Sequence, residues 1–387
     1  MSLGLLVIVA FFVLFVLGVP VAFAILLPSI AYIWWEGIPL ATVAQRALYA
    51  LDSFPLVAVP VFIFVGNLMN AAGITSKLFQ FADVLVSRLH GGLAQVNIFA
   101  SLIFSGISGA ALADVGGLGR IEIRAMRDRG FPLPFSAAVT GASAIVGPIF
   151  PPSIPIIIYA SVTSVSALQL LMAGILPALL CVALLMLTVA IIAQRVQLPR
   201  ADRWPTLTQL GRAFWPALPA LLAPVILIGG MLSGSFTPTE ASAVAVVYVL
   251  LVGIFYYRDM NWAFIREAAL ETVRSTAAIL FIVAAAAMFG WILAVEQIPQ
   301  SFASWFGSFS DNPLMLLLIV NLIFFVAGMF VDSTTATLLL VPIVAPPVVA
   351  AGVDPVHLGI VVIFNLMIGT TTPPFGLSLF LLCNMTG

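Results

Sequence analysis

The chain has 387 residues, of which 63% are hydrophobic and 7% are charged, and its net charge is −1. A soluble domain carries roughly 25% charged residues, so this composition excludes a soluble enzyme. The charges form no basic stripe of the kind that a nucleic-acid partner requires. Charge-free runs that can hold spans of about 20 residues recur along the whole chain. The composition therefore predicts an all-α polytopic membrane protein.

Hydropathy predicts eight spans and leaves two further apolar stretches to be explained. The spans are 4–35, 54–73, 135–162, 168–193, 214–233, 240–257, 276–296 and 356–385. We interpret 4–35 as a retained span rather than a signal peptide, because it lacks a basic start and a cleavage site. Residues 78–90, 261–274 and 298–310 are polar on one side only, which is typical of amphipathic helices at a membrane surface.

The two remaining stretches, 92–119 and 313–350, are predicted to be re-entrant hairpins that return to the side from which they enter. With both treated in this way, every lysine and arginine except Arg46 falls on one side of the membrane. The positive-inside bias makes that side cytoplasmic, and it places the N-terminus there too. A full crossing at either stretch would destroy this segregation. We therefore expect the first hairpin to open to the cytoplasm and the second to the outside.

Two parts of the chain carry similar motifs in the same order. FSGISGAALAD (104–114) and VGPIFPPSIP (146–155) correspond to AGMFVDSTTAT (327–337) and IGTTTPPFG (368–376). Because the two hairpins enter from opposite sides, the pattern predicts an inverted-topology repeat. The first repeat covers 1–195, residues 196–239 form a cytoplasmic loop and a connecting span, and the second repeat covers 240–387.

The paired prolines predict that each repeat contains a broken helix, within 135–162 and 356–385. Proline removes a backbone donor, and glycine allows the chain to unwind. Unwound backbone at membrane depth lines a cavity or is buried in protein. Its free carbonyls suit Na⁺, and the starts of half-helices suit an anionic group. Ordinary proline kinks are the alternative, but the matched positions indicate a secondary transporter.

Asp332 is the only charged residue in the second hairpin. A carboxylate at membrane depth is costly and is by default a functional residue. It can bind a cation, accept a hydrogen bond from a substrate or carry a proton; the alternative is that it only caps the helix that begins at Ser333. Asp114 lies near the end of the first hairpin and is expected to form a local ion pair with Arg120 or Arg124.

These motifs, together with LGVPVAFAILL (17–27), SFPLVAVPVFIFVGNLMNAAGI (53–74) and FTPTEASAVAVVY (236–248), resemble the large membrane subunit of tripartite ATP-independent periplasmic (TRAP) transporters over nearly the whole chain. The resemblance implies an elevator-type, Na⁺-coupled importer in the bacterial inner membrane, with no enzymatic activity. The partners it implies are a small four-helix membrane subunit and a periplasmic solute-binding protein. The substrates it implies are small organic acids, such as C4-dicarboxylates, sialic acid and other sugar acids.

The resemblance also implies site residues. Substrate is expected at Ser108, Ser153 and Asp332. Sodium is expected around residues of the hairpin tips and the broken helices, namely Ser105, Gly106, Gly109, Gly147, Pro148, Gly328, Ser333, Thr334, Gly369 and Thr372. The chain departs from the family pattern in two respects: Ala110 stands where many members have a second serine, and the given sequence stops at Gly387, where members usually continue with one more span.

Two other classes of function stay open at this point. One is a stand-alone carboxylate carrier of the same ion-transporter superfamily. The other is an intramembrane enzyme that uses Asp332 and Asp114, although no HExxH, GxSxG or DxD motif accompanies them. The chain also has no GxxxxGK[ST] phosphate loop, so we expect an ion gradient rather than ATP to drive transport.

Overall fold

The structure is a computed structural model that describes residues 3–71, 73–196, 198–200, 204–258, 260–307 and 312–386. Throughout these ranges the regular secondary structure is helical. Within the described residues, six helices are long and apolar enough to cross a membrane, or seven if the bent pair α3 and α4 counts as one span. These six are α11 (Ala167–Val196), α12 (Leu207–Leu232), α13 with its π-helical extension (Pro238–Tyr257), α14 (Trp262–Val295), α16 (Pro313–Phe330) and α17 (Ser333–Ala350).

The predicted span 4–35 is not one helix. It forms α1 (Leu3–Val16) and α2 (Val21–Trp35), which pack against each other. The chain turns between them at Gly18, whose φ of +83° lies in the left-handed region. Pro20 precedes the first turn of α2, where a fixed φ costs nothing. The next helices are α3 (Ala41–Leu51), α4 (Phe54–Ala71) and α5 (Ile74–Val86).

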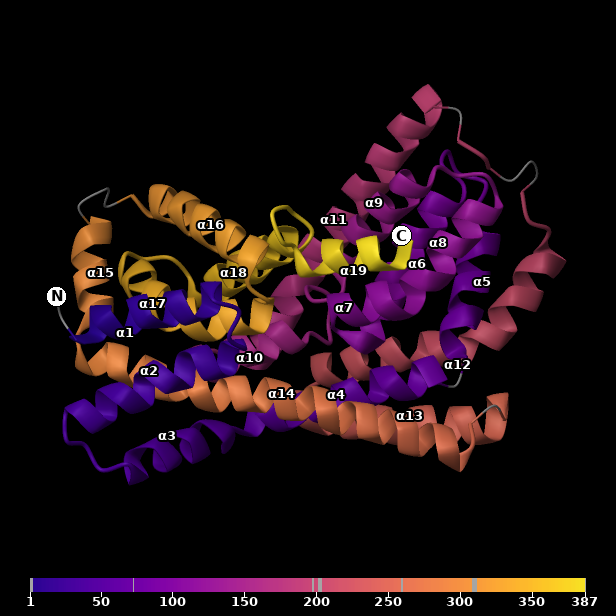
Figure 1. Cartoon of the computed structure of the whole chain (residues 1–387). Coiled ribbons are helices and arrows are strands. Elements are labelled where there is room, and N and C mark those ends of the chain that lie inside the picture. The colour runs from indigo at the N-terminus through magenta and orange to yellow at the C-terminus, as the bar shows by residue number, and fades with distance from the viewer. Residues whose placement is uncertain are drawn as a thin grey trace.

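The long helix α14 organises one side of the molecule. It packs against α2, α3 and α4, and α4 in turn packs against α13 (Figure 1). The predicted surface helix 261–274 and the predicted span 276–296 are both parts of α14, so the prediction of two separate helices is wrong. No glycine or proline lies between Trp262 and Phe289 to end the helix. We call α2, α3, α4, α13 and α14 the outer group.

The first hairpin and the first break lie next to each other in the fold. The hairpin consists of α6 (Leu93–Ser108) followed by a helical run from Ala111 to Asp128. That run comprises α7 (Ala111–Ala113), a π-helical turn (Asp114–Leu118) and α8 (Gly119–Asp128). The next span is α9 (Leu133–Ser143), a 3₁₀ turn (Ala144–Val146) and α10 (Ile154–Thr163), with the break at residues 147–153.

The second hairpin and the second break have the same order. After α15 (Ile298–Gly307), α16 and α17 form the hairpin, with the turn at residues 331–332. Residues 308–310 of the predicted amphipathic helix lie outside the described residues. The span that follows is α18 (Pro355–Thr370) and α19 (Leu377–Thr386), broken at residues 371–376. Both arms of this hairpin are long enough to cross a membrane, so its re-entrant course stays a prediction that rests on the charge distribution.

The two hairpins and the two broken spans pack into a second group, which we call the inner group. Helix α16 packs on α18, α17 on α10, and α11 on both α6 and α18. Large side chains without exposed surface fill it, including Phe104, Tyr159 and Phe324. Such dense packing holds the helices of the inner group together, because small displacements of buried side chains lose many contacts at once.

Candidate functional site

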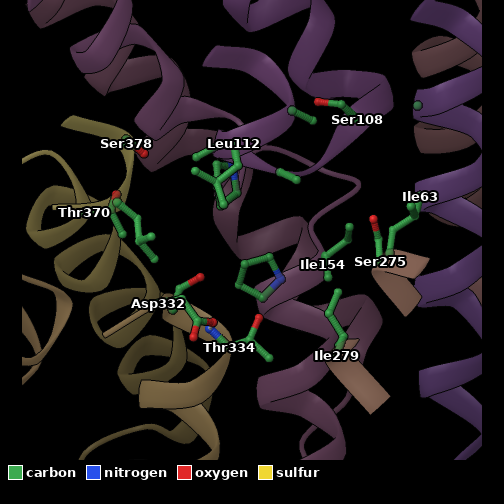
Figure 2. A pocket seen from close by; sticks show the side chains of 18 of the residues that line it. Ile63, Ser108, Leu112, Ile154, Ser275, Ile279, Asp332, Thr334, Thr370 and Ser378 are labelled. Carbon is green, nitrogen blue, oxygen red and sulfur yellow. Dashed lines mark hydrogen bonds between the residues drawn. The ribbon is translucent and has the colours of Figure 1, made fainter. Parts of the chain in front are cut away.

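A cavity of about 490 Å³ lies where the inner group meets α4 and α14 of the outer group. Its size is typical of small-molecule sites. Figure 2 shows side chains from both hairpins reaching it, with Ser275 and Ile279 entering from α14. The lining residues with polar side chains are Asn67, Ser108, Glu271, Ser275, Asp332, Ser333, Thr334, Thr370 and Ser378.

Ser108 ends α6 at the tip of the first hairpin. It is 2% exposed, and its Oγ has no hydrogen-bond partner among the described residues. The next residue, Gly109, has a φ of +61°, and a Cβ there would lie 2.3 Å from the carbonyl oxygen of Pro152. The Ile154 N–H also donates to the Gly109 carbonyl at 3.3 Å. The tip of the first hairpin is therefore in direct contact with the first break. The Ser108 hydroxyl lines the cavity without a hydrogen-bond partner among the described residues.

Ser153, the second predicted substrate residue, has a different position. Its Oγ accepts a hydrogen bond from the Ile156 N–H at 3.2 Å and donates to the Pro148 carbonyl. The side chain is fully buried and does not line the cavity. Ser153 is the N-cap of α10, and both of its hydrogen-bonding capacities are used there. Its predicted contact with substrate stays a prediction.

Asp332, the third predicted substrate residue, caps a helix and lines the cavity, and its predicted contact with substrate stays a prediction. Its Oδ1 accepts hydrogen bonds from the backbone N–H groups of Thr334 and Thr335 at 3.0 and 3.1 Å, and its Oδ2 accepts from the Thr335 hydroxyl. The carboxylate is thus the N-cap of α17. It also lines the cavity, where Figure 2 shows it beside Thr334. The cap fixes the carboxylate in place and leaves part of it available to a ligand.

The candidate sodium residues gather at the two breaks. In the first half, a Cβ at Gly147 would lie at ordinary contact distance from two oxygen atoms, 3.5 Å from the Ala144 carbonyl oxygen and 3.7 Å from Ser105 Oγ. In the second half, a Cβ at Gly376 would lie 2.8 and 2.9 Å from the carbonyl oxygens of Thr372 and Thr370. Carbonyl or hydroxyl oxygen atoms therefore lie near each break. Carbonyl and hydroxyl oxygens are the ligands that hard cations prefer, so this donor set fits a sodium ion.

The other candidates lie around these spaces. Gly106 is in contact distance of Pro224 of α12, and Pro148, Ser333 and Thr334 line the cavity. Gly328 and Gly369 bring α16 and α18 together, since a Cβ at Gly369 would lie 2.6 Å from the backbone of Gly328. The Thr372 hydroxyl donates to the Ile368 carbonyl at 2.8 Å, which leaves its oxygen lone pairs available.

Asp114 does not form the predicted ion pair, and this prediction is wrong. Arg124 lies 4.0 Å from Asp128 instead. Asp114 is turned inward, 2% exposed, and neither of its carboxylate oxygens has a hydrogen-bond partner among the described residues. Glu122, which the sequence analysis did not select, is 1% exposed and is equally without partners there. Glu122 could have been predicted from its spacing. It lies eight residues after Asp114, and residues seven or eight apart lie on the same face of a helix.

Further polar residues line the cavity that were not predicted from the sequence. Ser378 follows the TPP motif and is 1% exposed, with an Oγ that has no partner among the described residues. Glu271, Ser275 and Asn67 come from the outer group. The signal for Ser378 was its position one turn past a proline break. No local signal marks the outer-group residues, because only the packing of α4 and α14 brings them to the cavity.

Residues 8–387 match the family described as the tripartite ATP-independent periplasmic transporter, DctM component. The chain belongs to this family. It is 45% identical over 367 residues to the sialic acid TRAP transporter large permease protein SiaM of Vibrio cholerae, covering 94% of this chain and 85% of that protein.

Two more comparisons bear on the family. The chain is 38% identical to the C4-dicarboxylate TRAP transporter large permease protein DctM of Pseudomonas aeruginosa, covering 89% of this chain and 81% of that one. The YdaH transporter of Alcanivorax borkumensis has a similar fold, with a TM-score of 0.61, 16% identity, and coverage of 89% and 80%. SiaM and DctM are named as permeases, so the chain is a membrane transport protein of the TRAP large-permease type and not an enzyme.

Proposed function

We propose that the chain is the substrate-translocating subunit of a sodium-coupled importer of small organic acids. The observation that carries this proposal is the cavity itself. It is bounded by both hairpins, by both broken spans and by α4 and α14, so a solute in it contacts the inner and the outer group at once. A site at such a boundary is suited to alternating access, because a movement of one group relative to the other exposes it on a different side.

The proposed movement is of the elevator type. The inner group would carry the cavity along the outer group, with the two halves forming an inverted-topology repeat. The fixed partner surface is provided by α14, whose 34 residues span about 50 Å at 1.5 Å per residue. The outer-group contribution to the cavity consists of Ile63, Gly66 and Asn67 of α4 and of Glu271, Ser275 and Ile279 of α14. These residues follow helical spacing, so each helix presents one face along which the inner group can slide.

Sodium is proposed to bind at the two oxygen-lined breaks. At the first, Ser105 Oγ and the Ala144 carbonyl oxygen lie within 3.7 Å of the Cβ position of Gly147; at the second, the carbonyl oxygens of Thr370 and Thr372 lie within 2.9 Å of the Cβ position of Gly376. A bound cation supplies positive charge next to the cavity. This would favour occupation by an anionic solute and so couple the two ligands, because each raises the affinity of the other by the same factor.

The proposed partners are a small four-helix membrane subunit and a periplasmic solute-binding protein, in the bacterial inner membrane with the N-terminus in the cytoplasm. The small subunit is proposed to cover the outer group. At the start of α14, Trp262 is 77% exposed and Phe264 is 38% exposed, and such apolar faces need lipid or protein to cover them. Crosslinks from the small subunit to Ser108 or Ser333 in place of α14 would contradict this arrangement.

The proposal is tested by uptake into proteoliposomes. These would hold the large and small subunits, a panel of candidate binding proteins and labelled organic acids, with an inward gradient of Na⁺. Uptake is expected with Na⁺ and without ATP, and it should stop when choline replaces Na⁺. Uptake driven by a proton gradient alone would contradict sodium coupling, and uptake without any binding protein would favour a stand-alone carrier.

A further inference from the structure

Three exposed arginines lie on one face of α8, the helix that completes the first hairpin. Arg120, Arg124 and Arg127 are spaced at i, i+4 and i+7, which places them in a row along the helix. They line a groove of about 410 Å³ between α8, the start of α9 and the end of α19. We call it the arginine groove. It shares no lining residue with the cavity between the inner and outer groups.

The protein offsets little of the positive charge in the arginine groove. The Asp128 carboxylate lies 4.0 Å from Arg124 Nε and 3.9 Å from Arg127 Nε, too far for a hydrogen bond to either. Arg120 has no acidic partner within 4.0 Å among the described residues, because Asp114 is turned inward. Each guanidinium carries five N–H donors in a fork that matches the oxygens of a phosphate. The groove therefore favours a phosphate-type anion.

The remaining wall of the arginine groove is largely apolar. Ile123, Leu133 and Met385 line it, and they belong to a small hydrophobic cluster with the buried Leu382 of α19. A free phosphate ion gains nothing from such side chains, and an acidic peptide segment would have to desolvate its backbone against them. A phospholipid has both parts that the groove requires: a phosphate for the arginines and hydrocarbon for the apolar wall.

The arginine groove also lies at the level expected for lipid head groups. Residues 120–129 contain four arginines, whereas 130–194 and 355–387 contain no aspartate, glutamate, lysine or arginine. Leu133 belongs to the first of these charge-free runs and Met385 to the second, so the groove marks a boundary between a basic and an apolar zone (Figure 1). It faces the predicted cytoplasmic side, where anionic lipids give the membrane surface a negative potential.

We propose that the arginine groove binds an anionic phospholipid, with its phosphate held by Arg120, Arg124 and Arg127 and its hydrocarbon packed against Ile123, Leu133 and Met385. Helix α8 belongs to the first hairpin and α19 to the second broken span, so the lipid bridges the two halves of the inner group. Its binding stabilises the folded protein, because any ligand of the native state does so by mass action.

The test is the melting temperature of the full chain in detergent, titrated at constant ionic strength with dioleoylphosphatidylglycerol, dioleoylphosphatidylcholine or sodium phosphate. Phosphatidylglycerol should raise the melting temperature and reach saturation. The zwitterionic lipid and the free phosphate should each require far higher concentrations. Arg124→Gln should raise the apparent Kd for phosphatidylglycerol roughly fivefold, and the triple variant Arg120→Gln, Arg124→Gln, Arg127→Gln roughly a hundredfold.

A matched triple variant separates a defined site from general surface charge. Arg195→Gln, Arg212→Gln and Arg266→Gln together remove the same charge from exposed positions on the same predicted side, outside the arginine groove. This variant should change the apparent Kd by roughly twofold or less. An equal loss of affinity in both triple variants would overturn the proposal, because the lipid would then respond only to net charge.

Met385→Gln tests the hydrocarbon contact. It should raise the apparent Kd for phosphatidylglycerol roughly fivefold and leave the response to free phosphate unchanged. Sodium phosphate acting at the same concentrations as phosphatidylglycerol would show a site for a free anion and would overturn the assignment to lipid. Loss of phosphatidylglycerol binding when the small membrane subunit is added would show that the groove is a protein interface, and would overturn it as well.

Discussion

The two halves of the inner group share a backbone plan but differ in their polar interiors. In each half an asparagine of the first hairpin helix is hydrogen-bonded to the broken span: Asn97 donates to Thr140 at 2.7 Å, and Asn321 accepts from Asn365 at 2.7 Å, with sequence separations of 43 and 44 residues. Each half also has one cis proline, at Pro152 and at Pro374.

Beyond this shared plan, the first half is much more polar inside. Ser101 donates to Ser143, which donates to Asn97, and the carboxylates of Asp114 and Glu122 are buried in the same half. At the offset that relates Ser108 to Ser333, the partner of Asp114 is the apolar Leu339. The second half instead has its carboxylate, Asp332, at the hairpin turn and facing the cavity. The comparison teaches that two halves with the same order of helices carry different chemistry, with buried acids in one half and a cavity-lining acid in the other.

The largest expected effect comes from Asp332→Asn. Asparagine can still cap α17 through its side-chain oxygen, so stability should change by only tenths of a kcal/mol. Loss of the charged contact should weaken binding by roughly 1.5–3 kcal/mol, or about ten- to a hundredfold in apparent affinity. We expect a folded protein with nearly abolished uptake at limiting substrate and Na⁺.

Asp354→Asn is the control, since Asp354 caps α18 with the same pattern, accepting from the N–H groups of Val356 and His357 at 2.9 and 2.8 Å, but outside the cavity. It should transport like wild type. Normal uptake by Asp332→Asn would show that both aspartates are only caps, and the two halves would then differ less than their geometry indicates.

Gly109→Ala tests the contact between the first hairpin tip and its break. The new Cβ would meet the Pro152 carbonyl oxygen at 2.3 Å and would also strain a φ of +61°. Gly73→Ala is a matched control, because Gly73 has a φ of +62° and no atom within 4 Å of its Cβ position. Both variants should lose about 1 kcal/mol from backbone strain. Only Gly109→Ala should lose a further 1–3 kcal/mol from overpacking, together with transport; equal melting temperatures would contradict the close packing at the tip.

Much of this architecture could be predicted from the sequence, because helix breaks depend on local chemistry. Proline pairs and glycines located both breaks, and serine-rich tips located both hairpins. What sequence reasoning missed depends on packing between distant segments. The orientation of Asp114, the burial of Glu122 and the arrival of Glu271 at the cavity are set by neighbours far away in the chain. The single span predicted for 4–35 failed differently, since Gly18 and Pro20 gave a local signal that hydropathy averaging concealed.

Asp114→Asn tests whether the buried carboxylates of the first half lower the free energy of unfolding. A buried carboxylate without hydrogen-bond partners is unfavourable, and a second one nearby adds repulsion. The amide has the same shape and no charge. We expect the free energy of unfolding to rise by about 1–3 kcal/mol, measured as a higher melting temperature in detergent.

Asp83→Asn is the control variant. Asp83 is paired with Arg129 at 2.9 Å near the surface, so its replacement should change the free energy of unfolding by about 1 kcal/mol or less. A lower melting temperature for Asp114→Asn would mean that the native protein holds a compensating cation or proton there.

The smallest expected effect concerns the asparagine hydrogen bond that each half contains. Asn365→Ala removes one bond to the part-buried Asn321, which keeps a second partner because its Nδ2 donates to the Leu317 carbonyl at 2.7 Å. Its cost should be about 1 kcal/mol or less, as for other hydrogen bonds between helices in membranes. Asn97→Ala leaves two fully interior hydroxyls, those of Thr140 and Ser143, without their asparagine partner, so its cost should be larger, about 1–3 kcal/mol. The measurement is the shift in thermal midpoint of each variant. Equal shifts would show that the polar chain through Ser101 and Ser143 adds nothing to the first half, and the contrast between the halves would then rest on their carboxylates alone.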